Sequence, residues 1–517
     1  MTDSRPARVL DRYTEVGTLC QTVASAVSRI VVPFAVVSFS TAAYLGYEGR
    51  PGAWAFAMMA VGTCFALKVW ASAAVGLPLL PMLAVQNLLI YGVPILVSHE
   101  VILTFTADEL FTAGREVLIL NVAMAGSWLL SMRMFQPGLP YSYVFFEINR
   151  EGIKGWRRMG FSMIVSATTF QVLLGLNLLG GLYAILPNGS DSLINTLVSV
   201  VGACGFFLVS MVIGGGAAPV TEKTAFWVLL TINALISASG FLLAGAAAYL
   251  ISVAAGLFWS GGRVPWRFLA IAFLGLTFLN VGKTTMRERY WGTDESRAAD
   301  ISISQMPAHY AEWADVSLNA ILENSESTRD QSALGSPIKN KNQTLLDRLD
   351  NLQNLLFVVD AMDFGHVKPL YGKTYSLIPP LLIPRVLWPD KPRSHEGQIL
   401  LNVHFGRQDL NSTFTTYIAW GLLPEVYGNF GPITGSLLLG VFLGVSFAWM
   451  ENFLARKLLV STEGLIALSI FMNLMNSFEM VASVLVTSMF QSIMVIVIAS
   501  APFVRRMRNP RPLADSG

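Results

Sequence analysis

Charged residues and cysteines are both scarce in this sequence. Only 13% of the 517 residues are Asp, Glu, Lys or Arg, against roughly 25% in soluble domains, and 53% are hydrophobic. The net charge of +2 is too small to indicate a nucleic-acid partner. The three cysteines, Cys20, Cys64 and Cys204, all lie outside the long polar stretch 284–430, which excludes a disulfide framework or a thiol nucleophile there. We therefore expect one all-α polytopic membrane protein.

Apolar runs recur along almost the whole chain, and each span needs roughly 20 such residues to cross the hydrocarbon. We predict about twelve spans, near residues 27–47, 53–70, 73–97, 116–135, 160–186, 191–214, 221–237, 239–260, 266–283, 431–450, 462–478 and 480–503. The long runs 221–260 and 463–503 each require a break, which we place at 237–240 and 477–479. Gly440 and Gly444, four residues apart, predict close helix packing.

Five topological segments follow from these spans. They are a cytoplasmic N-terminal tail (1–26), a first transmembrane block of about nine spans (27–283), a large outer loop (284–430), a C-terminal block of about three spans (431–503) and a cytoplasmic tail (504–517). The run 26–47 is longer than a signal-peptide core and lacks a small-x-small cleavage site, so we expect it to be retained as a span.

Basic residues predict the orientation. Segments expected inside hold most Lys and Arg, including Arg5, Arg8, Arg12, Lys154, Arg157, Arg158, Arg456, Arg505 and Arg506. The short outer loops hold almost none. This predicts a multi-pass membrane protein with both termini cytoplasmic and the large loop on the outer side of the membrane. Charged residues at the ends of spans are expected to anchor them, and the apparent lack of carboxylates deep in spans argues against an ion pathway.

The second half of the large loop contains two predicted membrane-associated segments. An amphipathic helix is predicted at 343–361, where leucines recur every three or four residues opposite Asp347, Arg348, Asp350 and Asn354. It either packs over the bundle or lies as a lid on the membrane surface. The proline-broken run 376–389 is too short to span, so we predict a re-entrant or interface-bound segment.

A cationic patch lies between residues 366 and 407. It contains Lys368, Lys373, Arg385, Lys391, Arg393 and Arg407, against only Asp390 and Glu396. Arginine donates two parallel hydrogen bonds to phosphate, and Trp388 suits the membrane interface. The pattern indicates a ligand with an apolar tail and an anionic headgroup. The alternatives are binding of anionic lipid headgroups and simple loop solubility.

Three stretches resemble the Wzy-type oligosaccharide repeat-unit polymerases of O-antigen and exopolysaccharide synthesis. They are Ile383-Pro-Arg-Val-Leu-Trp-Pro-Asp-Lys-Pro392 with Gly397-Gln, then Ser412-Thr-Phe with Gly421 and Glu425-Val-Tyr-Gly-Asn-Phe-Gly431, and upstream Asn280-Val-Gly-Lys283 with Arg287 and Tyr290-Trp291. The plan of about a dozen spans with a large outer loop late in the chain is also similar. One departure is that no arginine-x10-glycine spacing occurs at Arg385, Arg393 or Arg407.

The resemblance implies a metal-independent membrane glycosyltransferase with a GT-C-like bundle and no cofactor. It also implies a location in the bacterial inner (plasma) membrane, with the large loop periplasmic or extracellular. Its substrate would be an undecaprenyl-diphosphate-linked oligosaccharide in the lipid bilayer, and its partners a chain-length regulator and a flippase. The residues expected to hold the diphosphate and glycan are Lys283, Arg287, Arg385, Lys391, Arg393, Arg407, Trp388, Tyr427 and Asn429. Glu425 is the first candidate for the general base and His395 the second, with Arg385 and Arg407 as catalytic cations.

Two other functions remain open at this point. A lipid-linked oligosaccharide flippase would bind the same lipid, but it should show internal repeats and broken helices that converge at the midplane. No repeat is visible, and the cations gather at one face. A glycan ligase of the O-antigen type shares architecture and donor with a polymerase, so the sequence separates these two poorly.

Overall fold

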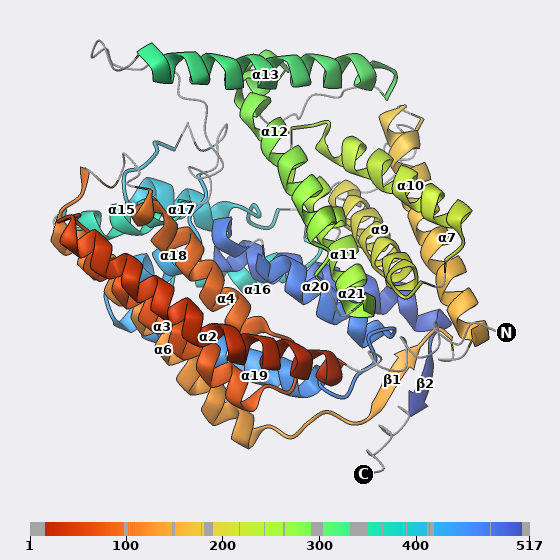
Figure 1. The fold of residues 1–517 in the computed structure, drawn as a ribbon, viewed down its shortest axis with the longest axis horizontal. Helices are drawn as coiled ribbons and strands as arrows, with labels where there is room; N and C mark the ends of the chain where they lie inside the picture. Colours follow the sequence, from red (N-terminus) through yellow and green to blue (C-terminus); the bar gives the residue numbers. More distant parts are fainter. Residues whose placement is uncertain are drawn as a thin grey trace. The chain divides into compact units, whose positions relative to one another are not determined.

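The chain forms two compact units. The computed structural model describes residues 16–97, 102, 104–146, 150–176, 178–179, 190–216, 218–241, 243–261, 264–290, 303–330, 350–363, 365–385, 387–388, 390–410, 413, 418–475 and 477–508 (Figure 1). Unit 1 comprises residues 1–11, 146–348 and 414–416, and unit 2 comprises 12–145, 349–413 and 417–517. The predicted topological segments cut across these units, since both the first transmembrane block and the large loop divide between them.

Long apolar helices dominate both units, which makes the chain an all-α membrane protein. Within the described ranges, nine helical segments are long and apolar enough to cross a membrane: Cys20–Tyr47, Ala53–Ala73, Leu79–Leu96, Ala107–Met134, Ile194–Gly214, Leu243–Ser260, Trp266–Lys283, Thr434–Leu454 and Ala482–Phe503. The other three predicted spans are also helical, as α7 (Arg150–Gly175), α10 (Val220–Ala238) and α20 (Thr462–Met475). Of these, α20 has only 14 residues. The total of twelve spans therefore stays a prediction.

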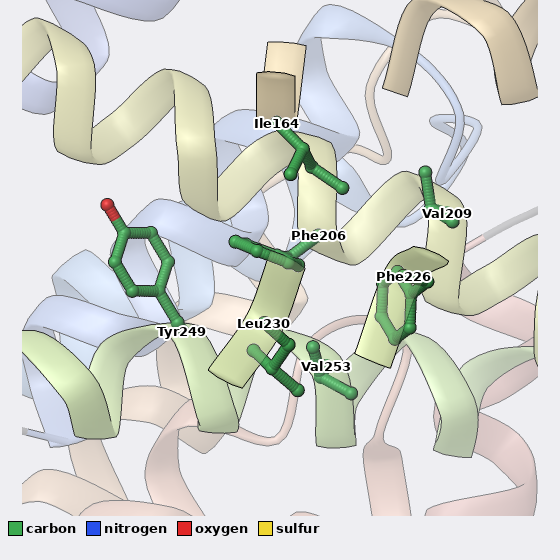
Figure 2. Packing of buried hydrophobic residues seen from close by; sticks show 7 residues of the cluster. All are labelled: Ile164, Phe206, Val209, Phe226, Leu230, Tyr249 and Val253. Atoms are coloured by element: carbon green, nitrogen blue, oxygen red, sulfur yellow. The ribbon is translucent and has the colours of Figure 1, made fainter. Parts of the chain in front are cut away.

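Unit 1 contains α7, α9 (Ser190–Gly214), α10, α11 (Leu243–Gly261), α12 (Trp266–Tyr290), η3 (Ile303–Gln305) and α13 (Met306–Asp330). Figure 2 shows its core, in which Ile164, Phe206, Val209, Phe226, Leu230, Tyr249 and Val253 pack together. The helix α10 ends at Ala238 and α11 begins at Leu243, which confirms the predicted break near 237–240. The helix α13 lies across the end of α12, where Trp313 Nε1 donates to Leu279 O at 2.8 Å (Figure 1).

Unit 2 is built on α2 (Val16–Tyr47), α3 (Ala53–Ala73), α6 (Ala107–Met134) and α19 (Thr434–Leu454), which pack side by side (Figure 1). Gly440 and Gly444 give α19 its close approach to α6. A Cβ at Gly440 would lie 2.7 Å from Leu120 O, and one at Gly444 would lie 2.2 Å from Met124 O. The predicted close packing at these glycines is confirmed.

The rest of unit 2 consists of shorter elements. They are α4 (Leu79–Asn87), the π-helix η1 (Leu88–Gly92), α5 (Val93–Leu96), α15 (Leu352–Asp363), η4 (Tyr375–Leu377), α16 (Ile378–Leu382), α17 (Glu396–His404), α18 (Leu422–Phe430), α20, η6 (Ser477–Glu479), α21 (Ala482–Ser500) and η7 (Ala501–Phe503). The strands β1 (Tyr141–Val144) and β2 (Arg505–Arg508) pair antiparallel, with Tyr141 opposite Arg508. The break predicted at 477–479 is confirmed by η6.

The amphipathic helix differs from its prediction. Residues 350 and 351 are not helical, α15 runs from Leu352 to Asp363, and residues 343–349 lie outside the described residues. The helix packs against α6 and α18 within its own unit. Asp350 and Asn354, predicted on the polar face, are 6% and 8% exposed. Packing of α15 against α6 and α18 buries this end of the helix, and Asn354 Nδ2 donates to Ala419 O at 2.9 Å there.

Two buried carboxyl groups lie inside the helices that can span the membrane, although the sequence placed them at the ends of its spans. Glu116, the first residue of the predicted span 116–135, lies within α6, and Glu451, one residue beyond the predicted span 431–450, lies within α19; both are 0% exposed. Glu116 accepts from Ser436 Oγ at 2.6 Å and forms an ion pair with Arg115 at 2.9 Å. Glu451 accepts from the indole nitrogens of two buried tryptophans, Trp70 at 3.1 Å and Trp128 at 3.1 Å. Hydrogen bonds from the protein replace the water that each carboxyl group loses on burial.

Candidate functional site

The predicted site residues are divided between the two units. Lys283 and Arg287 lie on α12 of unit 1. Lys283 is 4% exposed, and Arg287 Nη2 donates to Phe241 O at 3.0 Å. The other predicted site residues, Arg385, Trp388, Lys391, Arg393, His395, Arg407, Glu425, Tyr427 and Asn429, all belong to unit 2. Most of the predicted site residues therefore lie in unit 2.

Lys391 holds the proline-broken segment together. Its Nζ donates to Leu381 O at 2.9 Å and to Ile383 O at 2.5 Å, and the residue is 8% exposed. Burial, with a smaller effect from Arg385, lowers the pKa of Lys391. Because α16 ends at Leu382, these carbonyls have lost their helical partners. Lys391 thus donates hydrogen bonds to the carbonyl groups at the C-terminal end of α16, a role that its sequence context did not indicate.

The neighbouring polar residues make local bonds. Arg385 Nη2 donates to Pro392 O at 3.2 Å. Arg393 pairs with Glu396 at 3.3 Å, and His395 Nδ1 lies 2.8 Å from Gln398 Oε1. Trp388 is 40% exposed. These contacts shape the loop between α16 and α17 and leave Trp388 at its surface.

Arg407 occupies a different environment, in a half-buried cluster of aromatic and amide side chains. Its Nη1 donates to Asn354 Oδ1, and its guanidinium carbon lies 5.4 Å from the centre of the Phe357 ring and 6.0 Å from that of Trp420. Burial lowers the pKa of Arg407 to about 10. Among the residues that the structure describes, no carboxylate forms an ion pair with it. A half-buried cation balanced only by neutral groups favours an external anion.

Glu425 lies in the first turn of α18 and is completely buried. Its Oε2 accepts from the backbone N–H of Ala482 at 2.5 Å. Burial raises the pKa of Glu425 to about 7, an effect that the Ala482 N–H and the Thr374 hydroxyl oppose. The charge of Glu425 in turn contributes, after burial, to the raised pKa of Tyr375. A carboxyl group that titrates near neutral pH suits general-base chemistry.

The other predicted residues of α18, Tyr427 and Asn429, bond to other parts of unit 2. Asn429 Nδ2 donates to Thr374 Oγ1 at 2.9 Å and to Glu425 O at 2.8 Å, and its Oδ1 accepts from Gly372 N at 3.0 Å. The Tyr427 hydroxyl lies 3.5 Å from both oxygens of the Asp363 carboxylate. The amide of Asn429 is therefore engaged with the polypeptide on both its oxygen and its nitrogen.

A packed aromatic path connects Arg407 to α18. The rings of Trp420 and Phe405 have centroids 5.7 Å apart. A Cβ at Gly428 would lie 2.9 Å from the Phe405 ring, so only glycine leaves room for Phe405 against α18. Gly428 is three residues from Glu425 in the same helix. Arg407 and Glu425 are thus parts of one packed region of unit 2.

Sequence reasoning missed several residues of this region. Asn354, Phe357 and Trp420 surround Arg407, while Thr374 and Ala482 contact Glu425. One signal was present in the sequence, because Asn354 falls in the leucine-rich run that starts α15. No comparable signal connects residue 425 to residue 482.

Comparison with protein-family models finds no match to this chain, and comparisons with curated proteins and with solved structures find none either. Over the described ranges, no group of three or more His, Cys, Asp or Glu residues is placed to hold a metal ion.

Proposed function

We propose that this membrane protein is a glycosyltransferase that polymerises undecaprenyl-diphosphate-linked oligosaccharide repeat units into a surface polysaccharide. The proposal joins the resemblance of residues 383–392 and 425–431 to Wzy-type polymerases with one structural observation. That observation is the half-buried guanidinium of Arg407. Among the residues described, its positive charge is contacted only by the neutral side chains of Asn354, Phe357 and Trp420.

Arg407 supports recognition of an anion with several oxygens. A guanidinium has five N–H donors, and one nitrogen of Arg407 is engaged with Asn354. The two flanking rings of Phe357 and Trp420 restrict the plane of the group, so little entropy is lost when it binds phosphate. Charge-assisted hydrogen bonds of this kind contribute roughly 1.5–3 kcal/mol each. A diphosphate is the anion that matches both the donor fork and the lipid environment.

The loop between α16 and α17 supports a lipid carrier. Leu387 is 77% exposed and Ile383 is 39% exposed, beside the 40% exposed Trp388. Apolar side chains that stay exposed in a cationic segment fit the membrane interface. In this proposal they contact the prenyl chain or the surrounding lipid while cations face the headgroups.

Glu425 supplies the general base. A hydroxyl oxygen of the incoming repeat unit forms a bond to the anomeric carbon of the growing glycan, and its proton passes to the Glu425 carboxylate. The bond between that carbon and the diphosphate oxygen breaks, and undecaprenyl diphosphate leaves with the electron pair. Arg407 stabilises the charge that the leaving group gathers. A base in this position contributes roughly 10²–10⁴-fold.

A flippase remains the second candidate, because one membrane-spanning helix contains a π-helical turn. The helix Leu79–Leu96 changes from α-helix to π-helix over Leu88–Gly92, and such turns often occur at functional sites.

Deletion of the gene, followed by gel analysis of the surface glycan, separates these functions. A polymerase deletion leaves a single repeat unit where wild-type cells show a ladder, and this is the result we expect. Complete polymer retained on its lipid carrier would identify a ligase. Loss of lipid-linked material from the outer leaflet would identify a flippase. Complementation with Arg407→Ala should give normal protein levels without a ladder, and a full ladder from that variant would remove Arg407 from the proposal.

A further inference from the structure

The π-helical span Leu79–Leu96 of unit 2 is joined to the candidate site by polar contacts. At the π-helix η1, Ile90 O accepts from the backbone N–H of Asn351 at 3.1 Å. Asn351 immediately precedes α15, the helix that carries Asn354. A π-helical turn inside a helix often occurs at a functional site, and irregular backbone at membrane depth has to be satisfied by protein. Here the Ile90 carbonyl is satisfied by Asn351, and the helix that follows Asn351 carries the partner of Arg407.

Three side-chain hydrogen bonds continue this contact to Arg407. Asn351 Nδ2 donates to the Tyr91 hydroxyl at 3.3 Å, and Asn354 Nδ2 donates to Asn351 Oδ1 at 2.5 Å. Asn354 Oδ1 then accepts from Arg407 Nη1. Tyr91, Asn351 and Asn354 are 1%, 3% and 8% exposed, so these bonds form in a protected environment where their geometry is well held.

The order of donors and acceptors gives this series of hydrogen bonds a direction. Because the Tyr91 oxygen accepts from Asn351 Nδ2, the oxygen of that amide faces Asn354. Because Asn351 Oδ1 and Ala419 O both accept from Asn354 Nδ2, the oxygen of Asn354 faces Arg407. A reversed Asn354 amide would place its NH2 group against the guanidinium, where two donors meet. The carbonyl oxygens of Ala419 and Trp420 and the guanidinium of Arg407 thus fix the orientation of the Asn354 amide, and Asn354 in turn orients the Asn351 amide toward the Tyr91 hydroxyl.

At the Tyr91 end, these hydrogen bonds border a small cavity of about 20 Å³, large enough for roughly one water molecule. Leucine and isoleucine side chains form most of its lining, and Gln86, Asn87, Tyr91, Asn351 and Ser477 provide the polar part. Asn87 Nδ2 donates to Asn121 Oδ1 at 2.9 Å, which ties the same span to α6. The π-helical span is therefore held on both sides by amides.

We propose that the π-helical span Leu79–Leu96 helps to position Arg407 for the lipid-linked diphosphate, with Tyr91, Asn351 and Asn354 as positioning residues. This inference rests on the proposed function, because it assigns Arg407 as the diphosphate ligand. Removal of the Tyr91 hydroxyl takes away one hydrogen bond of Asn351 and so loosens the contact between Asn354 and Arg407. The carbonyls of Ala419 and Trp420 still hold Asn354, so the effect is smaller than that of losing Arg407 itself.

The test uses purified full-length protein in phosphatidylcholine nanodiscs, titrated with undecaprenyl diphosphate. Four proteins are compared: wild type, Arg407→Ala, Tyr91→Phe and the double variant. Tyr249→Phe is the matched control, because the buried Tyr249 hydroxyl accepts from an amide, Gln171 Nε2, at 2.9 Å in unit 1. Thermal unfolding of each protein checks that it is folded.

We expect Arg407→Ala to weaken binding roughly tenfold to hundredfold and Tyr91→Phe about threefold to tenfold. In the Arg407→Ala background, Tyr91→Phe should have no further effect, and Tyr249→Phe should bind as the wild type does. Unchanged binding by Tyr91→Phe, with weak binding by Arg407→Ala, overturns the positioning role alone. Unchanged binding by Arg407→Ala removes the proposed diphosphate site. An equal effect of Tyr91→Phe in both backgrounds shows a general structural effect and also overturns the positioning role.

Discussion

The carboxylate of Glu425 accepts a hydrogen bond from the backbone N–H of Ala482 at 2.5 Å. Ala482 is the first residue of α21, whose preceding residue, Val481, provides no side-chain cap. Glu425 therefore caps α21 from a helix 57 residues earlier in the chain. The N-terminus of a helix favours a negative charge, whereas burial favours the neutral form and raises the pKa to about 7. The same carboxyl group therefore caps a helix and titrates near neutral pH.

The first prediction concerns stability as a function of pH. The folded protein keeps the Glu425 proton up to about pH 7, while the unfolded chain releases it near the ordinary value of 4.5. Between these values the folded state binds more protons, so stability falls as pH rises. Glu425→Gln keeps an acceptor for Ala482 but does not titrate. We expect the wild-type melting temperature to fall relative to that of Glu425→Gln between about pH 5 and about pH 8. Parallel melting curves across that range would show that Glu425 does not titrate there.

The second prediction concerns the balance of charge at Arg407. Asn354→Asp places a carboxylate where a neutral amide now accepts from the guanidinium. An internal ion pair should compete with the diphosphate, and we expect roughly tenfold weaker binding or worse. Asn354→Leu is the matched comparison, since it loses the same amide bonds without adding charge. Binding should be weaker for the Asp variant than for the Leu variant, and the reverse order would argue against charge competition.

The third prediction concerns the packing of α6 against α19. A methyl group at Gly444 would lie 2.2 Å from Met124 O and 2.1 Å from Ser127 Oγ, whereas one at Gly126 of α6 meets nothing within 4 Å. Gly444→Ala should therefore lower the free energy of unfolding by about 1–3 kcal/mol. Gly126→Ala should be neutral or stabilising by up to about 1 kcal/mol. Thermal unfolding in detergent measures both, and equal effects would contradict the close contact.

The fourth prediction concerns membrane topology. Lys373 and Lys154 are both exposed, the first in the predicted outer loop and the second in a predicted inner segment. In a background without Cys20, Cys64 and Cys204, a membrane-impermeant maleimide should label Lys373→Cys in intact cells. It should label Lys154→Cys only after the membrane is permeabilised. The opposite pattern would place the cationic patch in the cytosol and remove access to an outer-leaflet substrate.

Much of the architecture was predictable because apolar run length and small residues are local signals. The breaks after Ala238 and at Ser477, and the close packing at Gly440 and Gly444, agree with the structure. The start of α15 was less predictable, because the leucine spacing continues through residues 350 and 351, which are not helical. There Asn351 instead contacts Ile90 and Tyr91. Local periodicity does not contain that information.

The candidate site was predictable only in part, since charge is visible in a sequence but its partners are not. The patch 366–407 contains the right kinds of side chain, yet Lys391 satisfies carbonyls at the end of α16. Arg407 differs because its partners come from α15 and from Trp420. Contacts between distant segments also explain why Glu116 and Glu451 are tolerated in spans. Such pairings depend on the tertiary fold.

The most direct measurement is polymer synthesis by the purified protein. Wild type and Glu425→Gln, each in nanodiscs, are incubated with an undecaprenyl-diphosphate-linked repeat unit, and the products are separated on a gel. We predict a ladder with rungs one repeat apart from the wild type, and a rate reduced roughly 10²–10⁴-fold for a Glu425→Gln protein that is folded. Recovery of the repeat unit unchanged from the wild type, or an equal ladder from Glu425→Gln, would contradict the account.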